Sequence, residues 1–361
     1  MIDRNLIGDF DIWLFLATLL VLGIGMGVIY SATYHLEGVN YVARQCTWAG
    51  IGIIALFLGL VVDYKAVMRL AYLFYFINVG LLLLVLISGR VIYGAQRWLH
   101  FGSFSFQPSE LAKVTLVMVL SRFLGDRKGQ LTLWSLACAF MLVFIPMIFV
   151  IEQPDLGTAL VMLPILLVLL YIAKVPRRYL VTLVIAGLIV SPLLWFILED
   201  YQKTRLLVFL NPDIDPLGAG YATNQARIAI GSGGLFGKGW LSGTQTHLHF
   251  LPENRTDFIF ATVGEEFGFF GSVVLLGLYG FIIIRGLQIA QQAKDASGRL
   301  LASGISMMLL LHVFVNVGMA TGIMPVVGLP LPLMSYGGSC LATTLLSIGL
   351  LLNVRMRRFT F

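Results

Sequence analysis

Long apolar stretches recur along the whole chain, and each approaches the length of a membrane-spanning helix. A helix needs about 20 mostly apolar residues to cross the hydrocarbon core of a bilayer. With 58% hydrophobic and 12% charged residues, the 361-residue chain is also too apolar for a water-soluble globular protein. We therefore predict an all-α, polytopic integral membrane protein, residues 1–361 forming one membrane domain with about ten transmembrane helices. The predicted spans are 11–32, 45–62, 70–88, 109–124, 132–151, 156–173, 179–198, 258–290, 299–320 and 339–353.

The basic residues predict the orientation, because short segments rich in Lys and Arg stay on the cytoplasmic side of a membrane. The 174–178 loop (KVPRR) and the 355–358 tail (RMRR) fall on one side when ten spans are counted. Both termini are therefore expected to be cytoplasmic. The net charge of +6 reflects this topology, and no nucleic-acid partner is expected, because the chain has no soluble basic surface.

Residues 199–256 form the only long hydrophilic region, a large extracytoplasmic loop between spans seven and eight. Loops of this length are uncommon unless they are functional or disordered, and Trp240 with its apolar neighbours argues for structure. Its glycine-dense run, AIGSGGLFGKGW, departs from a phosphate-binding P-loop, since Ser232 replaces the first glycine and Lys238 precedes Gly239. The remaining interpretation is that the glycines let the backbone of this run approach another group closely.

Asp257 lies where this polar region runs into an apolar helix, within 243–271. Turn and helix-start residues precede it, which places the carboxylate in the first turn of a helix near the membrane surface. The positive end of that helix and Arg255 are expected to hold Asp257 ionised, so that it can accept a proton. The alternative is that Asp257 only caps the helix.

Other ionisable residues gather on the same outer side. Glu110 and Lys113 stand three apart on one helical face, which favours a buried structural pair; alternatively, Lys113, Arg97 or both hold a phosphate. Asp155 occupies an N-cap position for the sixth span. The 321–339 loop combines three prolines and four glycines with almost no charge, so its backbone is expected to be buried in protein or to line a cavity. Ser335 and Tyr336 are candidate walls of a site that includes Asp257.

These segments together resemble the SEDS family, and the resemblance covers nearly the whole chain. It is carried by YGAQRW with QPSELAK, QPDLGT, GSGGLFGKG with GTQT, FLPENRTDFIF with EEFG, and GLPLPLMSYGGS. The residues of the GSGGLFGKGW and GTQT motifs resemble the elongation-associated RodA branch more than the division-associated FtsW branch. Leu333 and Met334 depart from the Phe-Ile of many relatives, which exchanges one large apolar residue for another.

The resemblance implies a peptidoglycan glycosyltransferase that polymerises lipid II at the outer face of the bacterial cytoplasmic membrane. Asp257 matches the essential acidic residue of the family, Glu110 and Lys113 match its membrane salt bridge, and Asp155 matches its outer-face acidic residue. The implied partners are lipid II, the nascent glycan strand on undecaprenyl pyrophosphate, a class B penicillin-binding protein transpeptidase and other membrane proteins of the elongation complex.

The expected mechanism makes Asp257 the general base that takes the acceptor hydroxyl proton. The departing pyrophosphate needs cations, for which Arg97, Lys113, Lys238 and Arg255 are the unranked candidates, and a divalent cation, Mg²⁺ or Mn²⁺, could assist. No organic cofactor and no metal-ligating residues are predicted. Two alternatives remain open: a lipid II flippase, and a scaffold that only recruits the transpeptidase. The outer-side concentration of polar groups favours the enzyme, because a flippase needs a polar route through the whole membrane.

Overall fold

A computed structural model describes residues 8–34, 40–92, 95–101, 104–127, 132–196, 198–211, 214–216, 218, 220–248 and 250–358. Each of the ten predicted spans coincides with a helix of the structure, within a few residues. These helices are α2 (Ile12–Thr33), α3 (Tyr41–Val61), α5 (Ala71–Ser88), α6 (Pro108–Gly125), α7 (Leu133–Glu152), α8 (Leu156–Ile172), α9 (Arg177–Leu194), α13 (Ile259–Gln292), α14 (Ala296–Thr321) and α15 (Gly338–Met356).

Within the described residues, seven helices are long and apolar enough to cross a membrane: α2, α3, α5, α7, α13, α14 and α15. Shorter α8 is also apolar, α6 is less apolar and almost fully buried, and α9 begins with two arginines. The predicted polytopic, mainly helical fold is confirmed, whereas the count of ten spans stays a prediction.

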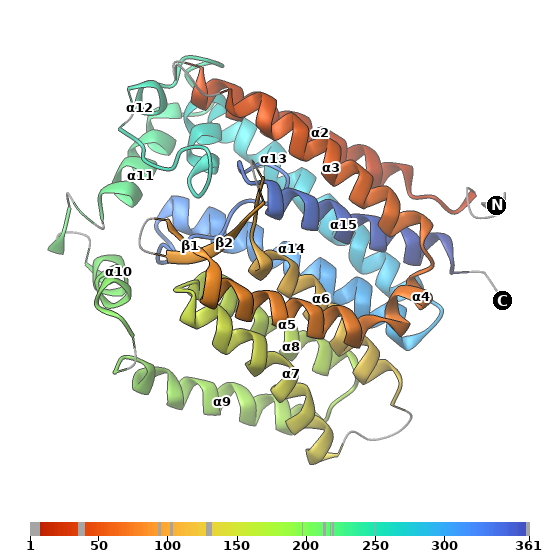
Figure 1. The fold of residues 1–361 in the computed structure, drawn as a ribbon. Helices are drawn as coiled ribbons and strands as arrows, with labels where there is room; N and C mark the ends of the chain where they lie inside the picture. The colour runs from red at the N-terminus through yellow and green to blue at the C-terminus, as the bar shows by residue number, and fades with distance from the viewer. Residues whose placement is uncertain are drawn as a thin grey trace.

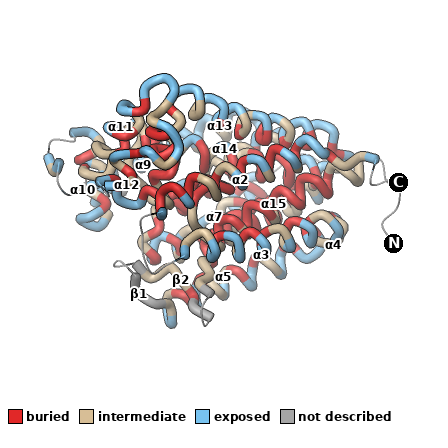
Figure 2. The backbone as a smooth tube through the Cα atoms, turned by 90° about the horizontal axis from the view of Figure 1, so that it is seen from above, coloured by how far each residue is buried: buried red, intermediate tan, exposed pale blue. Residues whose placement is uncertain are grey.

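The bundle is held together by close helix contacts at small residues. Helix α15 packs along α3, where a methyl group on Gly349 would lie 2.2 Å from the Leu56 carbonyl oxygen and one on Gly59 would lie 2.9 Å from the Leu346 oxygen. Small residues let membrane helices approach closely, which is how such helices gain packing energy within lipid. Helices α6, α14 and α15 form the interior, and most of their residues are buried; Figure 2 shows this for α15.

Helix α9 is the exception to this packing. It contacts α8, but every residue whose exposure is described is half-buried or exposed, and the helix stands apart from the bundle in Figure 1. Its exposed side chains are mostly apolar, which suits a lipid environment.

The region between α9 and α13 contains α10 (Asp200–Leu210), α11 (Tyr221–Gly233) and α12 (Thr244–His247). Its glycine-dense run lies against α13, which kinks at Gly268 with a φ of 64°. Backbone hydrogen bonds join the two: Phe269 N–H donates to Gly234 (2.9 Å) and Lys238 N–H donates to Glu265 (3.0 Å). The predicted close backbone approach is therefore made to a helix of the same chain.

One feature of the fold was not predicted. The 90–106 segment forms a three-stranded antiparallel sheet in the order β1 (Arg90–Ile92), β2 (Ala95–Phe101) and β3 (Phe104–Phe106). The sheet lies at the end of the bundle that also carries α10, α11 and α12, opposite the ends where α2 begins and α15 finishes (Figure 1). At that opposite end, Arg358 pairs with Asp9 (Nη2 to Oδ1, 2.6 Å), so the first and last described segments of the chain are neighbours.

Candidate active site at the end of the bundle

Asp257 lies in the turn that precedes α13, at the end of the bundle with the sheet. The helix N-cap is Phe258 and receives no side-chain hydrogen bond, so Asp257 does not cap the helix. In the described part of the chain, its carboxylate has no hydrogen bond or ion pair, and its side chain is only partly exposed. The capping alternative is therefore excluded, and both carboxylate oxygens are available for chemistry.

The backbone around Asp257 is fixed by buried amides and by the 322–337 loop. Asn316, fully buried on α14, donates from Nδ2 to the Asp257 carbonyl (2.9 Å) and to the Leu329 carbonyl (2.8 Å). A methyl group in place of the Gly328 hydrogen would lie 3.6 Å from Asp257 Oδ2, and Gly328 has a φ of 73° that disfavours other residues. The loop thus forms one wall beside the carboxylate.

Ser335 and Tyr336 continue this wall. Ser335 is buried; its hydroxyl donates to the Thr256 carbonyl (2.6 Å) and accepts from Leu331 N–H (2.8 Å), while Tyr336 N–H donates to the Arg255 carbonyl (2.8 Å). The Arg255 guanidinium lies 4.3 Å from the centre of the Tyr41 ring. The structure therefore brings Arg255, Ser335 and Tyr336 next to Asp257, as the sequence predicted.

The electrostatic reason given for an ionised Asp257 was wrong. Loss of water around the partly buried carboxyl raises the pKa of Asp257, and neighbouring Glu253 and Asp155 also raise it, so that its net value is about 6. Arg205 and Arg97 lower it, so these are the opposing cations. Arg255, the cation named from the sequence, instead stacks on Tyr41. A group with this pKa is still mostly ionised at neutral pH and is a well-matched general base.

Asp155 and Arg97 belong to a neighbouring network. Asp155 caps α8, accepting from Thr158 N–H (3.3 Å), and its second oxygen accepts from the Ser109 hydroxyl (3.0 Å). Arg97 on β2 donates from Nε to the Gln153 carbonyl (3.0 Å) and also donates to the Pro154 carbonyl. These contacts tie the sheet to the 153–155 turn, and the predicted N-cap role of Asp155 is confirmed.

Glu110 and Lys113 form a buried ion pair of 2.7 Å within the bundle. The Lys113 ammonium also lies 3.0 Å from Nε2 of His312, which is buried on α14. The expected structural pair is therefore present, joined to a second helix by a histidine that the sequence analysis did not single out. His312 and Asn316 stand four apart in an apolar span, and such intramembrane polar residues were the available signal.

Lys238 lies in the turn after α11 and pairs with Glu265 of α13 (Nζ to Oε1, 2.7 Å). Glu265 is fully buried and also accepts from the backbone N–H groups of Gln245 (2.8 Å) and Thr246 (3.1 Å). This network anchors the loop before Asp257 onto α13. The substrate contacts predicted for Lys238 and the other cations stay predictions.

A pocket beside this site adds two cations that the sequence analysis missed. It holds about 420 Å³ of empty space, part of it open to solvent, between α10, α11 and the 322–326 segment. Arg205 and Arg227 line it, while Asp257 does not. The 326–328 segment joins the two, because Val326 lines the pocket and Gly328 lies beside Asp257.

Within the described ranges, no group of three or more His, Cys, Asp or Glu side chains could hold a metal ion. The described residues therefore offer no all-protein metal site, and the expected divalent cation stays a prediction.

Together, the fold and this site define a multi-pass membrane protein with an acidic residue and a cationic pocket at one end of its helix bundle. The chain belongs to the FtsW/RodA/SpoVE family, described as cell cycle proteins, whose model matches residues 12–359. It is 41% identical over 332 residues to the peptidoglycan glycosyltransferase MrdB of Escherichia coli strain K12, covering 92% of this chain and 89% of that protein. The resemblance inferred from the sequence motifs is thus confirmed.

Solved structures agree with this assignment. One is described as "Structural coordination of polymerization and crosslinking by a peptidoglycan synthase complex"; it matches with a TM-score of 0.85 at 35% identity, covering 98% of this chain and 99% of that chain. The crystal structure of the rod shape-determining protein RodA of Thermus thermophilus matches with a TM-score of 0.74 at 33% identity, covering 98% of both chains.

Proposed function

We propose that this chain is a peptidoglycan glycosyltransferase that polymerises lipid II into glycan strands during cell elongation. The similarity to MrdB and RodA supports this activity. The observation that carries the assignment of the base is the Asp257 carboxylate, which is free of protein partners in the described chain, does not cap its helix, and is held beside an irregular loop.

The proposed reaction is a single displacement. The 4-hydroxyl oxygen of the acceptor sugar attacks the anomeric carbon of the donor sugar, and the Asp257 carboxylate takes the hydroxyl proton. The bond from that carbon to the undecaprenyl pyrophosphate breaks, and its electron pair leaves with the phosphate oxygen. Inversion at the anomeric carbon follows. Confinement of both lipid-linked substrates to one leaflet supplies much of the rate by positioning.

The remaining predicted contacts are assigned by where their side chains lie. Arg255, Ser335 and Tyr336 adjoin Asp257 and are proposed to shape the sugar site. Arg97 and Asp155 act through the network at the 153–155 turn. Lys113 with Glu110, and Lys238 with Glu265, are proposed to support the site from the interior, because each cation has a buried carboxylate partner.

The chain lies in the bacterial inner membrane as a multi-pass protein, with both termini cytoplasmic and Asp257 on the extracytoplasmic face. The basic 174–178 and 355–358 segments support this orientation, as does the position of the start of α2 and the end of α15 opposite the site (Figure 1). A class B penicillin-binding protein is the proposed partner, supported by the structural match to a complex that coordinates polymerization and crosslinking.

The decisive experiment uses the purified full chain, with and without the transpeptidase, and separates glycan chains made from labelled lipid II on a gel. Asp257→Asn is expected to lower the rate by a factor of about 10² or more, in the range removed with a general base. Asp200→Asn is the matched control, since its exposed carboxylate at the start of α10 makes only a 3.6 Å contact with Lys203. Normal polymerisation by Asp257→Asn rules out its role as base. Transport of lipid II without polymerisation instead supports a flippase. The absence of both transport and polymerisation supports a scaffold.

A further inference from the structure

The described lining of the pocket between α10 and α11 carries two positive charges. None of its eleven described lining residues is acidic, whereas Arg205 and Arg227 both line it. Asp215, which precedes α11, is engaged elsewhere, since its Oδ1 accepts from Gly218 N–H (2.9 Å). Two cations on a pocket whose described lining has no acidic side chain favour binding of an anion.

The two arginines differ in how they are held. Arg205 donates from Nη1 to the Val326 carbonyl (3.2 Å) and keeps its other donors. Arg227 is exposed, and no hydrogen bond, ion pair or ring contact involves its guanidinium in the described chain. By contrast, the four cations predicted from the sequence have carboxylate, carbonyl or aromatic partners. Both arginines therefore lie against the 322–328 segment with donors to spare, Arg205 at Val326 and Arg227 at Gly322.

One face of α11 forms a side of the pocket. The N-cap residue Gly220 and the α11 residues Thr223, Asn224 and Arg227 recur at the three- and four-residue spacing of one helical face. The 322–326 segment approaches this face closely, because a methyl group on Gly322 would lie 3.0 Å from Arg227 Cδ. Gly322 also has a φ of 77°, so two constraints require glycine here.

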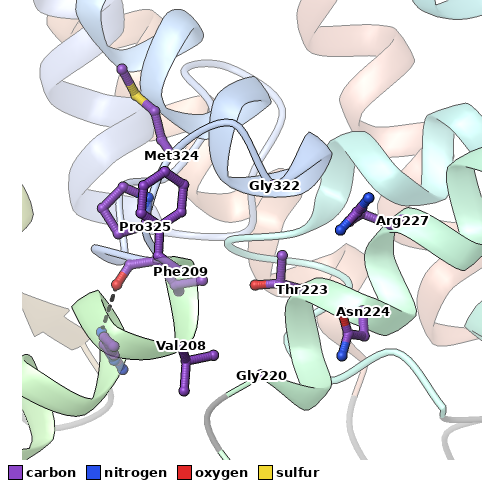
Figure 3. A pocket seen from close by; sticks show the side chains of 11 residues that line it. Val208, Phe209, Gly220, Thr223, Asn224, Arg227, Gly322, Met324 and Pro325 are labelled. Carbon is purple, nitrogen blue, oxygen red and sulfur yellow. Dashed lines mark hydrogen bonds between the residues drawn. The ribbon is translucent and has the colours of Figure 1, made fainter. Parts of the chain in front are cut away.

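The opposite side of the pocket is apolar. Phe209, Met324 and Pro325 lie across from the polar side chains of α11, as Figure 3 shows, and buried Val208 lies on the same side as Phe209. A small soluble anion has no apolar part that could contact these side chains. A phosphate joined to a hydrocarbon chain matches both sides, because guanidinium groups bind phosphate oxygens while the apolar side chains contact the lipid.

We propose that this pocket binds the diphosphate of the lipid-linked sugar substrate, with Arg205 and Arg227 as its phosphate ligands. The inference rests on the proposed function, which requires a diphosphate leaving group beside Asp257. The position fits, because the 326–328 segment lies between the pocket and the carboxylate. As the bond to the anomeric carbon breaks, the leaving phosphate oxygen gains negative charge, and the two guanidinium groups stabilise it.

The test measures binding without turnover, in the full chain carrying Asp257→Asn and reconstituted in neutral phosphatidylcholine vesicles. The probe is undecaprenyl pyrophosphate. Arg227→Gln and Arg205→Gln are each expected to weaken its binding about tenfold, the effect of losing a hydrogen bond to a charged group. Arg227→Lys keeps the charge and is expected to retain part of the affinity. Lys203→Gln removes a charge from α10 outside the pocket and should leave binding unchanged.

The same variants in vesicles containing anionic phosphatidylglycerol separate the two sources of phosphate. Unchanged binding of undecaprenyl pyrophosphate in both arginine variants overturns the proposal, and so does a loss confined to phosphatidylglycerol, which would make the pocket a phospholipid headgroup site. The proposed function is judged separately by polymerisation in the chain with Asp257 intact. If binding depends on the arginines but the chain does not polymerise lipid II, the proposed activity is rejected and the diphosphate site is kept. If the chain polymerises lipid II but binding does not depend on the arginines, the activity is kept and the site is rejected.

Discussion

The pKa of Asp257 predicts how polymerisation should depend on pH. A general base acts only when ionised, so kcat/KM should follow the ionised fraction of this carboxyl. With a pKa of about 6, that fraction is about one in eleven at about pH 5 and about ten in eleven at about pH 7. Activity should therefore rise about tenfold over this interval. A carboxyl at its ordinary value of 3.8 would be almost fully ionised throughout, and the profile would be nearly flat.

Two substitutions should move the midpoint of this profile in opposite directions. Glu253 is an exposed acidic neighbour that raises the pKa of Asp257, so Glu253→Gln should shift the rise in kcat/KM to lower pH. Arg97 lowers the same pKa, so Arg97→Gln should shift the rise to higher pH. The opposite signs exclude a general loss of activity as the explanation, since neither a damaged fold nor a weaker substrate contact moves a midpoint.

The assay is the initial rate of lipid II polymerisation by the purified chain at subsaturating substrate, between about pH 5 and pH 8. The diphosphate diester of lipid II stays ionised over this range, so the enzyme dominates the profile. Thermal unfolding at each pH separates loss of structure from loss of ionisation. A flat wild-type profile between about pH 5 and pH 7, or midpoints that both substitutions leave in place, would refute Asp257 as the base with this environment.

Two further predictions concern the support of the site. Gly233→Ala should lower the unfolding temperature and cost about 1–3 kcal/mol, because its methyl group would lie 2.0 Å from the Gly264 oxygen. Gly231→Ala is the control in the same helix: nothing lies within 4 Å of its methyl group, so it should keep or slightly raise the unfolding temperature. Lys113→Ala should cost about 3–5 kcal/mol in chemical unfolding, since it leaves Glu110 buried and unpaired. Equal stability of the two glycine variants, or a Lys113→Ala cost below about 1 kcal/mol, would contradict these assignments.

Sequence patterns located the helices and one side of the site for physical reasons. Apolar length identifies spans such as α2 and α14 directly, because the bilayer fixes the number of residues needed to cross it. The glycines near Gly233 indicated close backbone approach, and the structure supplies the partner, α13. The short strands of the 90–106 sheet lack a comparable signal, because each is only three to seven residues long and aromatic residues also suit a membrane interface.

Tertiary contacts decided what the patterns could not. Lys238 and Arg227 are both cations of the same loop region. Nothing in their local sequence shows that Lys238 pairs with Glu265 while the Arg227 guanidinium has no partner in the described chain. Arg205 was likewise indistinguishable from Lys203 on α10 until the Val326 carbonyl and the pocket gave it a place. The sequence therefore placed Ser335 and Tyr336 in one site with Asp257, and the structure brings these residues together, but ranking the cations required knowing which have partners.

The contacts around Asp257 also explain how the carboxylate can be positioned and reactive at once. Its backbone is held by Asn316, which binds the Asp257 and Leu329 carbonyls together, and by Ser335, which binds the Thr256 carbonyl. Buried hydrogen bonds of this kind fix geometry because leaving any of these groups unpaired would be costly. Since the backbone supplies the restraint, the side chain needs no protein partner of its own. A carboxylate fixed through its own oxygens would have its pKa lowered by those hydrogen bonds and would be a weaker base.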